Sequence, residues 1–153
     1  MVPEPPQEPA PTPAPAAPPP AQPAQSDWTE WPLAQGDWTY RAESRGSIAS
    51  FGPQNMQASF TIRCERDRNQ LVLSRAGTTA NSGAQMTLRT TSAAQSYPAR
   101  NSGNYAAISL PATDYMMDRI AFSRGRFAVE TTGLPHLAIP IWPEFTRVVE
   151  DCR

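Results

Sequence analysis

Residues 57–65 read Gln-Ala-Ser-Phe-Thr-Ile-Arg-Cys-Glu, a run in which apolar and polar side chains alternate. A period of two is typical of a β-strand with one buried face, and here that face carries Phe60, Ile62 and Cys64. The polar turn that follows leads into a partner strand over residues 70–75. This part of the sequence therefore predicts an antiparallel hairpin with one face in a hydrophobic core.

Six further segments have the composition of short strands. They cover residues 36–42, 47–51, 86–91, 105–110, 126–131 and 137–141. Two linkers, residues 77–83 and 100–104, are rich in Gly, Ser, Thr and Asn, and their composition predicts exposed loops. Most of the chain is therefore expected to be short strands joined by turns and loops.

Two helices are predicted near the C-terminus. Thr113 can cap a short helix over residues 114–122, and Pro143 suits the first position of a last helix. The apolar stripe of that last helix, at positions i, i+3, i+4 and i+7, consists of Phe145, Val148, Val149 and Cys152. We therefore expect a mainly β, α+β fold: an antiparallel β-sandwich-like domain with a short helix and a C-terminal helix packed on the sheet.

Proline divides the chain into two regions. Eleven of the 18 prolines lie between Pro3 and Pro23, in a stretch made almost only of Pro, Ala, Gln and Glu. Such a stretch cannot bury enough apolar surface to offset its ordering entropy. All the aromatic residues follow it. We expect residues 1–26 to be a disordered Pro/Ala-rich tail or linker and residues 27–153 to be a single β-rich globular domain.

The chain has two cysteines, Cys64 on the inner face of a predicted strand and Cys152 on the inner face of the last helix. A disulfide between them would close a loop of 88 residues, and the alternative is two separate buried thiols. Two cysteines without a CxxC motif are too few for a cysteine-based zinc site. We favour the disulfide, which indicates an oxidising compartment and places the protein in the periplasm or cell envelope.

The charge and hydropathy of the chain exclude some classes of partner. The sequence contains fourteen acidic residues and thirteen arginines, so the protein lacks the excess of basic residues that nucleic-acid binding needs. No run of 18 apolar residues predicts a transmembrane segment. No export signal is visible after Met1. Either a signal has been removed, with Met1 an added start, or the protein is cytosolic; the cysteines and the tail favour the first, and a lipid anchor upstream is compatible with it.

Known catalytic and metal-binding motifs do not occur in the sequence. His136 is the only histidine, and no recognisable nucleophile motif accompanies it. Asp114 and Asp118 share a predicted helix face, where an ordinary solvated surface is the preferred interpretation over a metal or acid site. We therefore predict no catalytic residue, no metal and no cofactor.

Two groups of side chains are candidates for a binding face. Trp28, Trp31 and Trp38 lie within eleven positions at the start of the domain, and exposed tryptophans are common anchors at interfaces. The alternative is that they fold back over the core, which we favour. Residues 115–117, Tyr-Met-Met, suit either an adaptable groove or the core, and the core is the preferred interpretation.

Several short motifs resemble the invasion-associated locus B family of alphaproteobacterial periplasmic proteins. They are Gly-Asp-Trp at residues 36–38, Cys64, Asp-Arg-Ile at 118–120, Arg-Phe-Ala-Val at 126–129 and Gly-Leu at 133–134. The resemblance implies an exported β-sandwich with no known enzymatic activity, and it carries over no site residues. This chain departs from the family in having one cysteine pair where more are expected.

The closing residues 142–152, Trp-Pro-Glu-Phe-Thr-Arg-Val-Val-Glu-Asp-Cys, are similar to those of exported proteins of unknown function from sphingomonad-type bacteria. We therefore expect a non-enzymatic periplasmic or envelope-associated protein that binds another envelope protein. A small hydrolase that uses His136 with an acid is a second hypothesis. A structural accessory subunit of an envelope assembly, with the tail as a spacer or docking peptide, is a third. The sequence does not indicate the oligomeric state.

Overall fold

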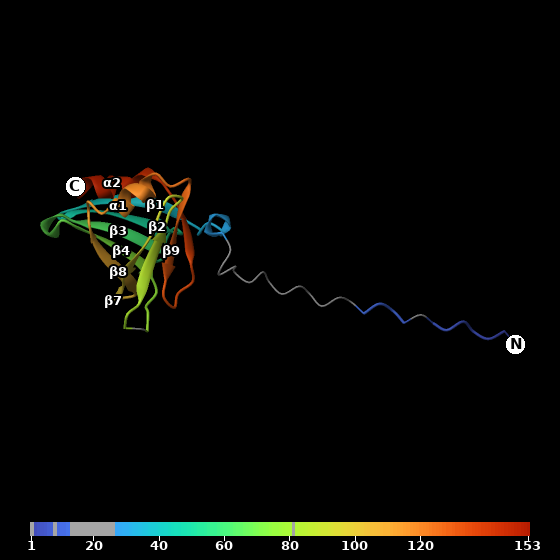
Figure 1. Cartoon of the computed structure of the whole chain (residues 1–153). Coiled ribbons are helices and arrows are strands. Elements are labelled where there is room, and N and C mark those ends of the chain that lie inside the picture. Colours follow the sequence, from blue (N-terminus) through green and yellow to red (C-terminus); the bar gives the residue numbers. More distant parts are fainter. Residues whose placement is uncertain (1, 8, 13–26, 81) are drawn as a thin grey trace.

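A computed structural model (Figure 1) describes residues 2–7, 9–12, 27–80 and 82–153. Residues 2–7 and 9–12 are exposed and have no regular secondary structure. The remaining positions of the predicted disordered tail, residues 1, 8 and 13–26, lie outside the described residues. The tail prediction therefore stays a prediction.

The larger of two antiparallel sheets has the strand order β1-β2-β3-β4-β8-β7. Its strands are β1 (Asp37–Glu43), β2 (Gly46–Gly52), β3 (Phe60–Glu65), β4 (Gln70–Ala76), β7 (Arg100–Ser102) and β8 (Tyr105–Pro111). The hairpin predicted around Cys64 is the β3–β4 pair, in which Cys64 lies opposite Leu71. Phe60, Ile62 and Cys64 are all buried, which confirms the predicted inner face.

The smaller sheet has the order β10-β9-β5-β6. Its strands are β5 (Gln85–Arg89), β6 (Ala94–Pro98), β9 (Arg126–Thr131) and β10 (Leu137–Pro140). Two α-helices, α1 (Tyr115–Ala121) and α2 (Pro143–Asp151), and two 3-10 turns, η1 (Trp28–Glu30) and η2 (Arg66–Arg68), complete the described part of the chain. The predicted mainly β, sandwich-like α+β fold with a C-terminal helix is confirmed.

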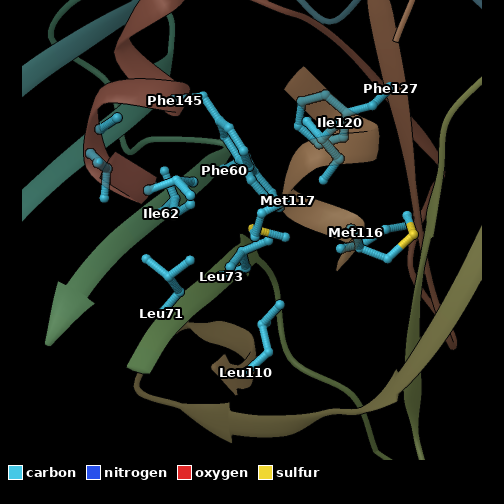
Figure 2. Close-up of a cluster of buried hydrophobic side chains, with 14 of the residues drawn as sticks. Phe60, Ile62, Leu71, Leu73, Leu110, Met116, Met117, Ile120, Phe127 and Phe145 are labelled. Carbon is cyan, nitrogen blue, oxygen red and sulfur yellow. The ribbon is translucent and has the colours of Figure 1, made fainter. Parts of the chain in front are cut away.

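The core lies between the two sheets and under both helices (Figure 2). Phe60 of the larger sheet and Phe127 of the smaller sheet meet edge to face, with ring centroids 5.7 Å apart. Phe127 also contacts Phe145 of α2, with ring centroids 5.5 Å apart, so a row of three aromatic rings joins both sheets to the last helix. Met116 and Met117 of α1 are buried in the same cluster, as the sequence predicts.

Helix α2 packs on β1, β2 and β3 and touches α1. Its first residue is Pro143, whose ring suits a position where no intrahelical N–H bond is made. Its predicted stripe is correct, since Phe145, Val148, Val149 and Cys152 are all buried. A disulfide joins Cys152 to Cys64 of β3 with the two Cα atoms 5.5 Å apart, which confirms the predicted bond.

Sequence patterning misses two of the four edge strands, β6 and β7. Residues 100–104 were expected to be a loop, but Arg100–Ser102 is β7, and Ala94–Pro98 forms β6 where no strand was predicted. All three residues of β7 are exposed, and four of the five in β6 are exposed. A strand that is solvated on both faces has no reason to alternate apolar and polar residues, so its periodicity carries no signal.

The strand predicted over residues 57–65 begins only at Phe60. Asn55 has a left-handed φ of 61°, and Ser59 N donates to Phe51 O at 2.8 Å where the chain rejoins β2. Similarly, the strand predicted over residues 86–91 ends at Arg89. The chain turns at Thr90, because the Thr90 hydroxyl accepts hydrogen bonds from the backbone N–H groups of Ser92 and Ala93.

Candidate functional site

A groove of about 690 Å³ runs beside the first two turns of α2. We call it the α2 groove. Its lining includes Tyr40 from β1, Ala121 from the end of α1, and Trp142, Glu144, Arg147 and Glu150 from α2 and the residue before it. The groove thus forms where β1, α1 and α2 meet at the surface.

Tyr40 and Arg147 stack on each other in the wall of the α2 groove. The guanidinium carbon of Arg147 lies 4.0 Å from the centre of the Tyr40 ring, a cation–π contact between β1 and α2. The Tyr40 hydroxyl donates to Asp151 Oδ2 at 2.5 Å. Tyr40 is therefore held at both its ring face and its hydroxyl, so this wall is rigid.

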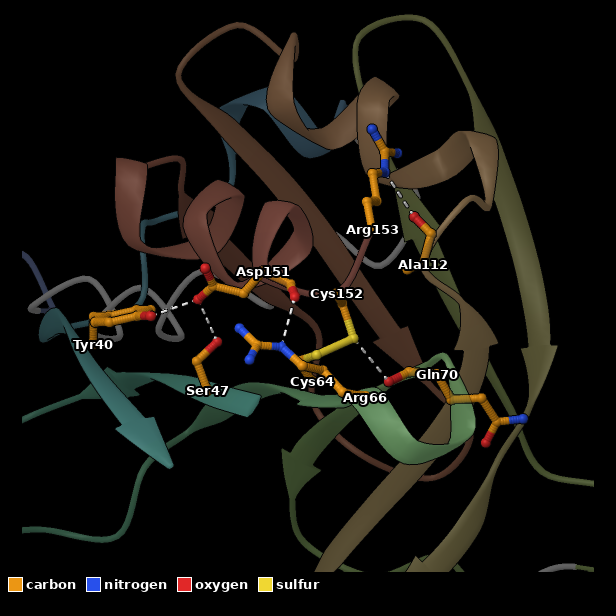
Figure 3. The surroundings of a disulfide bond; sticks show 9 residues. All are labelled: Tyr40, Ser47, Cys64, Arg66, Gln70, Ala112, Asp151, Cys152 and Arg153. Carbon is orange, nitrogen blue, oxygen red and sulfur yellow. Dashed lines mark hydrogen bonds between the residues drawn. A yellow bond between two sulfur atoms is a disulfide. The ribbon is translucent and has the colours of Figure 1, made fainter. Parts of the chain in front are cut away.

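Asp151, the last residue of α2, ties the helix to the larger sheet (Figure 3). Its Oδ2 accepts hydrogen bonds from Tyr40 and from Ser47 Oγ at 2.8 Å, and its backbone oxygen accepts from Arg66 Nε at 2.9 Å. The hydrogen bond from Tyr40 is the main reason that the pKa of Asp151 lies below its usual range, with help from Ser47 and the charges of Arg66 and Arg147.

Of the exposed large apolar side chains, one lines the α2 groove and another belongs to the residue that follows a lining residue in the chain. Trp142 is 37% exposed and lines the groove, and Phe122, 84% exposed, directly follows the lining residue Ala121. Trp142 precedes the first helical residue, so its side chain does not belong to the buried stripe of α2. A ring as exposed as that of Phe122 contributes little buried area to the fold. Both Phe122 and Trp142 are therefore open to contact with a partner.

The polar groups of the α2 groove have mixed charge. Arg147 is cationic, and Glu144 and Glu150 are acidic. Glu144 Oε2 is buried and has no hydrogen-bond partner in the described part of the chain. Because this oxygen is buried, the acceptors that the α2 groove presents at its surface are those of exposed Glu150.

The three tryptophans proposed from the sequence do not lie together on one exposed face. Trp38 is a core residue that packs on Phe51, Phe60 and Phe145, and its Nε1 donates to Pro140 O at 2.8 Å. Trp31 is also buried, on the outer face of the smaller sheet, where partly buried Trp28 packs beside it. Trp38 thus belongs to the core, whereas Trp31 and Trp28 cover the outer face of the smaller sheet instead of the main core.

His136 lies on that same outer face. Its Nδ1 is 3.3 Å from Glu130 Oε1, and its ring packs edge-on against Trp31 with centroids 4.9 Å apart. The other carboxylate oxygen of Glu130 pairs with Arg89 Nε at 2.5 Å. The structure thus gives the histidine an acidic neighbour, but that carboxylate is already neutralised by an arginine.

The hydroxyl groups of this face lie beyond Glu130. Strand register places Thr87 opposite Glu130 and Ser96 opposite Thr87, and the two hydroxyls bond each other at 2.6 Å. A hydrolytic triad needs the order acid, histidine, hydroxyl, so that the histidine can take the proton of the nucleophile. Across this sheet the acid stands between the histidine and the hydroxyls, which is the wrong order for that chemistry.

Asp114 and Asp118 serve local structure. Asp114 caps α1, with its Oδ1 accepting from Met116 N at 2.9 Å, and Asp118 pairs with Arg153 at 2.9 Å. Among the residues that the structure describes, no three His, Cys, Asp or Glu side chains gather in a way that could hold a metal ion. No helix described here is long and apolar enough to cross a bilayer.

Sequence reasoning missed Tyr40, Trp142 and Arg147. Tyr40 lies in the strand expected over residues 36–42, and Trp142 and Arg147 lie in the closing segment 142–152, to which no binding role was assigned. The available signal was Trp142, an aromatic residue directly before a helix-starting proline and therefore outside the apolar stripe. No pattern along the chain could show that β1 and α2 meet.

Comparison with protein-family models, curated proteins and solved structures finds no match to this chain.

Proposed function

We propose that this protein is an exported, envelope-associated module that binds another protein through the α2 groove. The observation that carries the proposal is the pairing of exposed Trp142 with the stacked Tyr40 and Arg147 in one groove. Tryptophan, tyrosine and arginine are the residue types that contribute most binding energy at protein interfaces. Two other hollows, one lined by Met56 and one by Arg45, contain neither tryptophan nor tyrosine.

The geometry of the groove suits an extended segment of a partner. Aromatic-lined grooves bind extended, often proline-rich peptides, because such peptides lose little entropy on binding. Rigid walls lower the entropic cost on the protein's side as well, and the contacts of Tyr40 with Arg147 and Asp151 supply that rigidity. The exposed charges of Arg147 and Glu150 offer polar contacts to fix the register of the bound segment.

The disulfide supports the proposed compartment. Disulfides persist in oxidising environments such as the periplasm, and Cys64–Cys152 is buried in the domain. The resemblance to the invasion-associated locus B family, which implies export, agrees with this proposal. Under the proposed function, the Pro/Ala-rich residues 1–26 act as a tether that holds the domain away from its anchor.

Site-specific photo-crosslinking tests the proposal. A photoreactive residue at Trp142 should give a discrete adduct with one protein in envelope preparations. Met56 is the matched control, because it is 70% exposed and lines a different hollow. Equal adducts from both positions, or none from position 142, would refute a partner site at the α2 groove.

The second candidate function is hydrolysis by His136, and the contact between His136 Nδ1 and Glu130 is the observation that favours it. It requires a nucleophile supplied from outside the row of hydroxyls described above, such as a water held by His136. A hydrolytic activity that is lost in His136→Ala, with the melting temperature unchanged, would establish this function in place of protein binding.

A further inference from the structure

Arg75 is an arginine on the core side of β4, and it is only 7% exposed. The burial pattern of β4 places it on the same face as Leu71 and Leu73. The register places Phe60 and Ala106 on either side of it. A guanidinium is rarely found in such surroundings without a carboxylate beside it.

The hydrogen bonds of Arg75 go only to neutral groups. Nη1 donates to Ala76 O, and Nη2 donates to Pro135 O at 2.5 Å. No acidic side chain of the described residues lies within ion-pair distance of it. Burial lowers the pKa of Arg75, in keeping with a charge that has no counterion. Arginine nevertheless stays protonated, so the site holds a nearly uncompensated positive charge.

One edge of this guanidinium is unoccupied. Arg75 Nε is buried and has no hydrogen-bond partner. A Cβ added at Gly77 would come within 3.6 Å of Nη1 and 2.9 Å of Leu134 Cδ2, so backbone and an apolar side chain close the site on that side. A buried donor of a charged group that lacks an acceptor is costly, which points to a partner that the protein chain does not provide.

A second buried group without a partner lies on the facing sheet. Thr131 Oγ1 is buried and makes no hydrogen bond within the described residues. The turn after β9 is closed by a hydrogen bond from Leu134 N to Thr131 O at 3.0 Å, and Pro135 directly follows Leu134. Since Arg75 Nη2 bonds Pro135 O, the guanidinium and Thr131 lie at the same end of the sandwich. In Figure 1 the turn after β9 and the loop after β4 both lie at that lower end.

We propose that Arg75 and Thr131 form a binding site for a small monovalent anion of about the size of chloride. Arg75 Nε supplies a charged donor, and the Thr131 hydroxyl supplies a second, neutral donor from the opposite sheet. Such an anion would satisfy both orphaned groups and neutralise the buried charge. The site shares no residue with the α2 groove, so it is independent of the proposed protein binding.

Binding of an anion to the folded protein alone raises its stability in a saturable way. The test follows urea unfolding of the full chain while chloride replaces gluconate, an anion too large for the site, at constant ionic strength. We expect the unfolding midpoint of the wild type to rise with chloride and then level off. Arg75→Met should remove this dependence. Arg89→Met is the matched control and should keep it, because Arg89 is half-exposed and paired with Glu130.

Thr131→Val retains the charge and the shape of the site and loses one hydrogen bond. It should raise the chloride concentration needed for half of the effect by about fivefold. This variant keeps the proposal testable if Arg75→Met does not fold. Excess broadening of the chloride-35 NMR signal by the wild type, smaller with Thr131→Val, is the independent measurement. A midpoint that does not respond to chloride, or responds equally in Arg75→Met, would overturn the proposal and leave internal water as the partner of Arg75.

Discussion

Replacing both cysteines, in Cys64→Ala/Cys152→Ala, tests how the last helix is held. The disulfide closes a loop of 88 residues. In the chain-entropy model, −2.1 − 1.5R ln 88 corresponds to about 4.6 kcal/mol at 25 °C. Losses measured for native disulfides of small secreted domains fall at about 2–5 kcal/mol. A domain of this size has about 5–15 kcal/mol in total, so the variant should fold with much reduced stability.

The other contacts of the C-terminus explain why the variant should keep α2 docked. Arg66 Nε still bonds Asp151 O at 2.9 Å, and Arg153 Nε still bonds Ala112 O at 2.9 Å. Phe145 also stays in the aromatic core. The loss should therefore fall mainly on the unfolded state, with the end of α2 the first part of the native state to open, as hydrogen exchange would show.

Urea unfolding followed by tryptophan fluorescence measures this loss by linear extrapolation. The control is reduction: dithiothreitol should destabilise the wild type to the level of the variant and leave the variant unchanged. A difference below about 1 kcal/mol between oxidised wild type and variant would refute the reasoning, because loop closure of this length predicts several times more.

Three further predictions concern other parts of the molecule. Phe60→Ala should lower the free energy of unfolding by about 3–5 kcal/mol in a urea titration, because it opens a cavity between the sheets; the control Phe122→Ala, at an exposed site, should stay within about 0.5 kcal/mol, and equal losses would contradict the packing described. Tyr40→Phe removes the main cause of the lowered pKa of Asp151. The stability that this carboxylate contributes is present above pH 3.8 and is lost as the pH falls through its lower, folded-state pKa. The difference in unfolding free energy between wild type and Tyr40→Phe should therefore be largest at neutral pH and shrink below pH 3.8. A difference that grows in acid would contradict this. His136→Ala should leave the circular dichroism spectrum and partner binding unchanged, and loss of partner binding by the folded variant would shift the site to the outer face of the smaller sheet.

Residues with one buried face could be placed from the sequence. Phe60, Ile62 and Cys64 show the period of two that a half-buried strand requires, and Phe145, Val149 and Cys152 show the helical spacing of a buried stripe. Those two faces have to bury against each other in one small domain, which is why the disulfide was predictable. Strand β7, exposed on both faces, gives no such pattern and was missed.

The candidate site could not be predicted in the same way. Tyr40 and Arg147 are more than one hundred positions apart, and only the pairing of β1 with the sheet beneath α2 brings them together. Arg75 is a comparable case, because its position in β4 alternates correctly for the core face although its charge indicates the surface. In both cases the contact depends on tertiary packing, for which a single sequence carries no periodic signal.

Affinity for the protein captured by the crosslink at Trp142, measured by titration calorimetry, tests most directly that the α2 groove is the binding face. Trp142→Ala should weaken binding by about 30-fold or more, the effect of removing an interface anchor worth about 2 kcal/mol. Arg147→Ala should also weaken it, and His136→Ala should not. If Trp142→Ala and Arg147→Ala bind with wild-type affinity while folded, or if His136→Ala alone abolishes binding, the α2 groove is not the site.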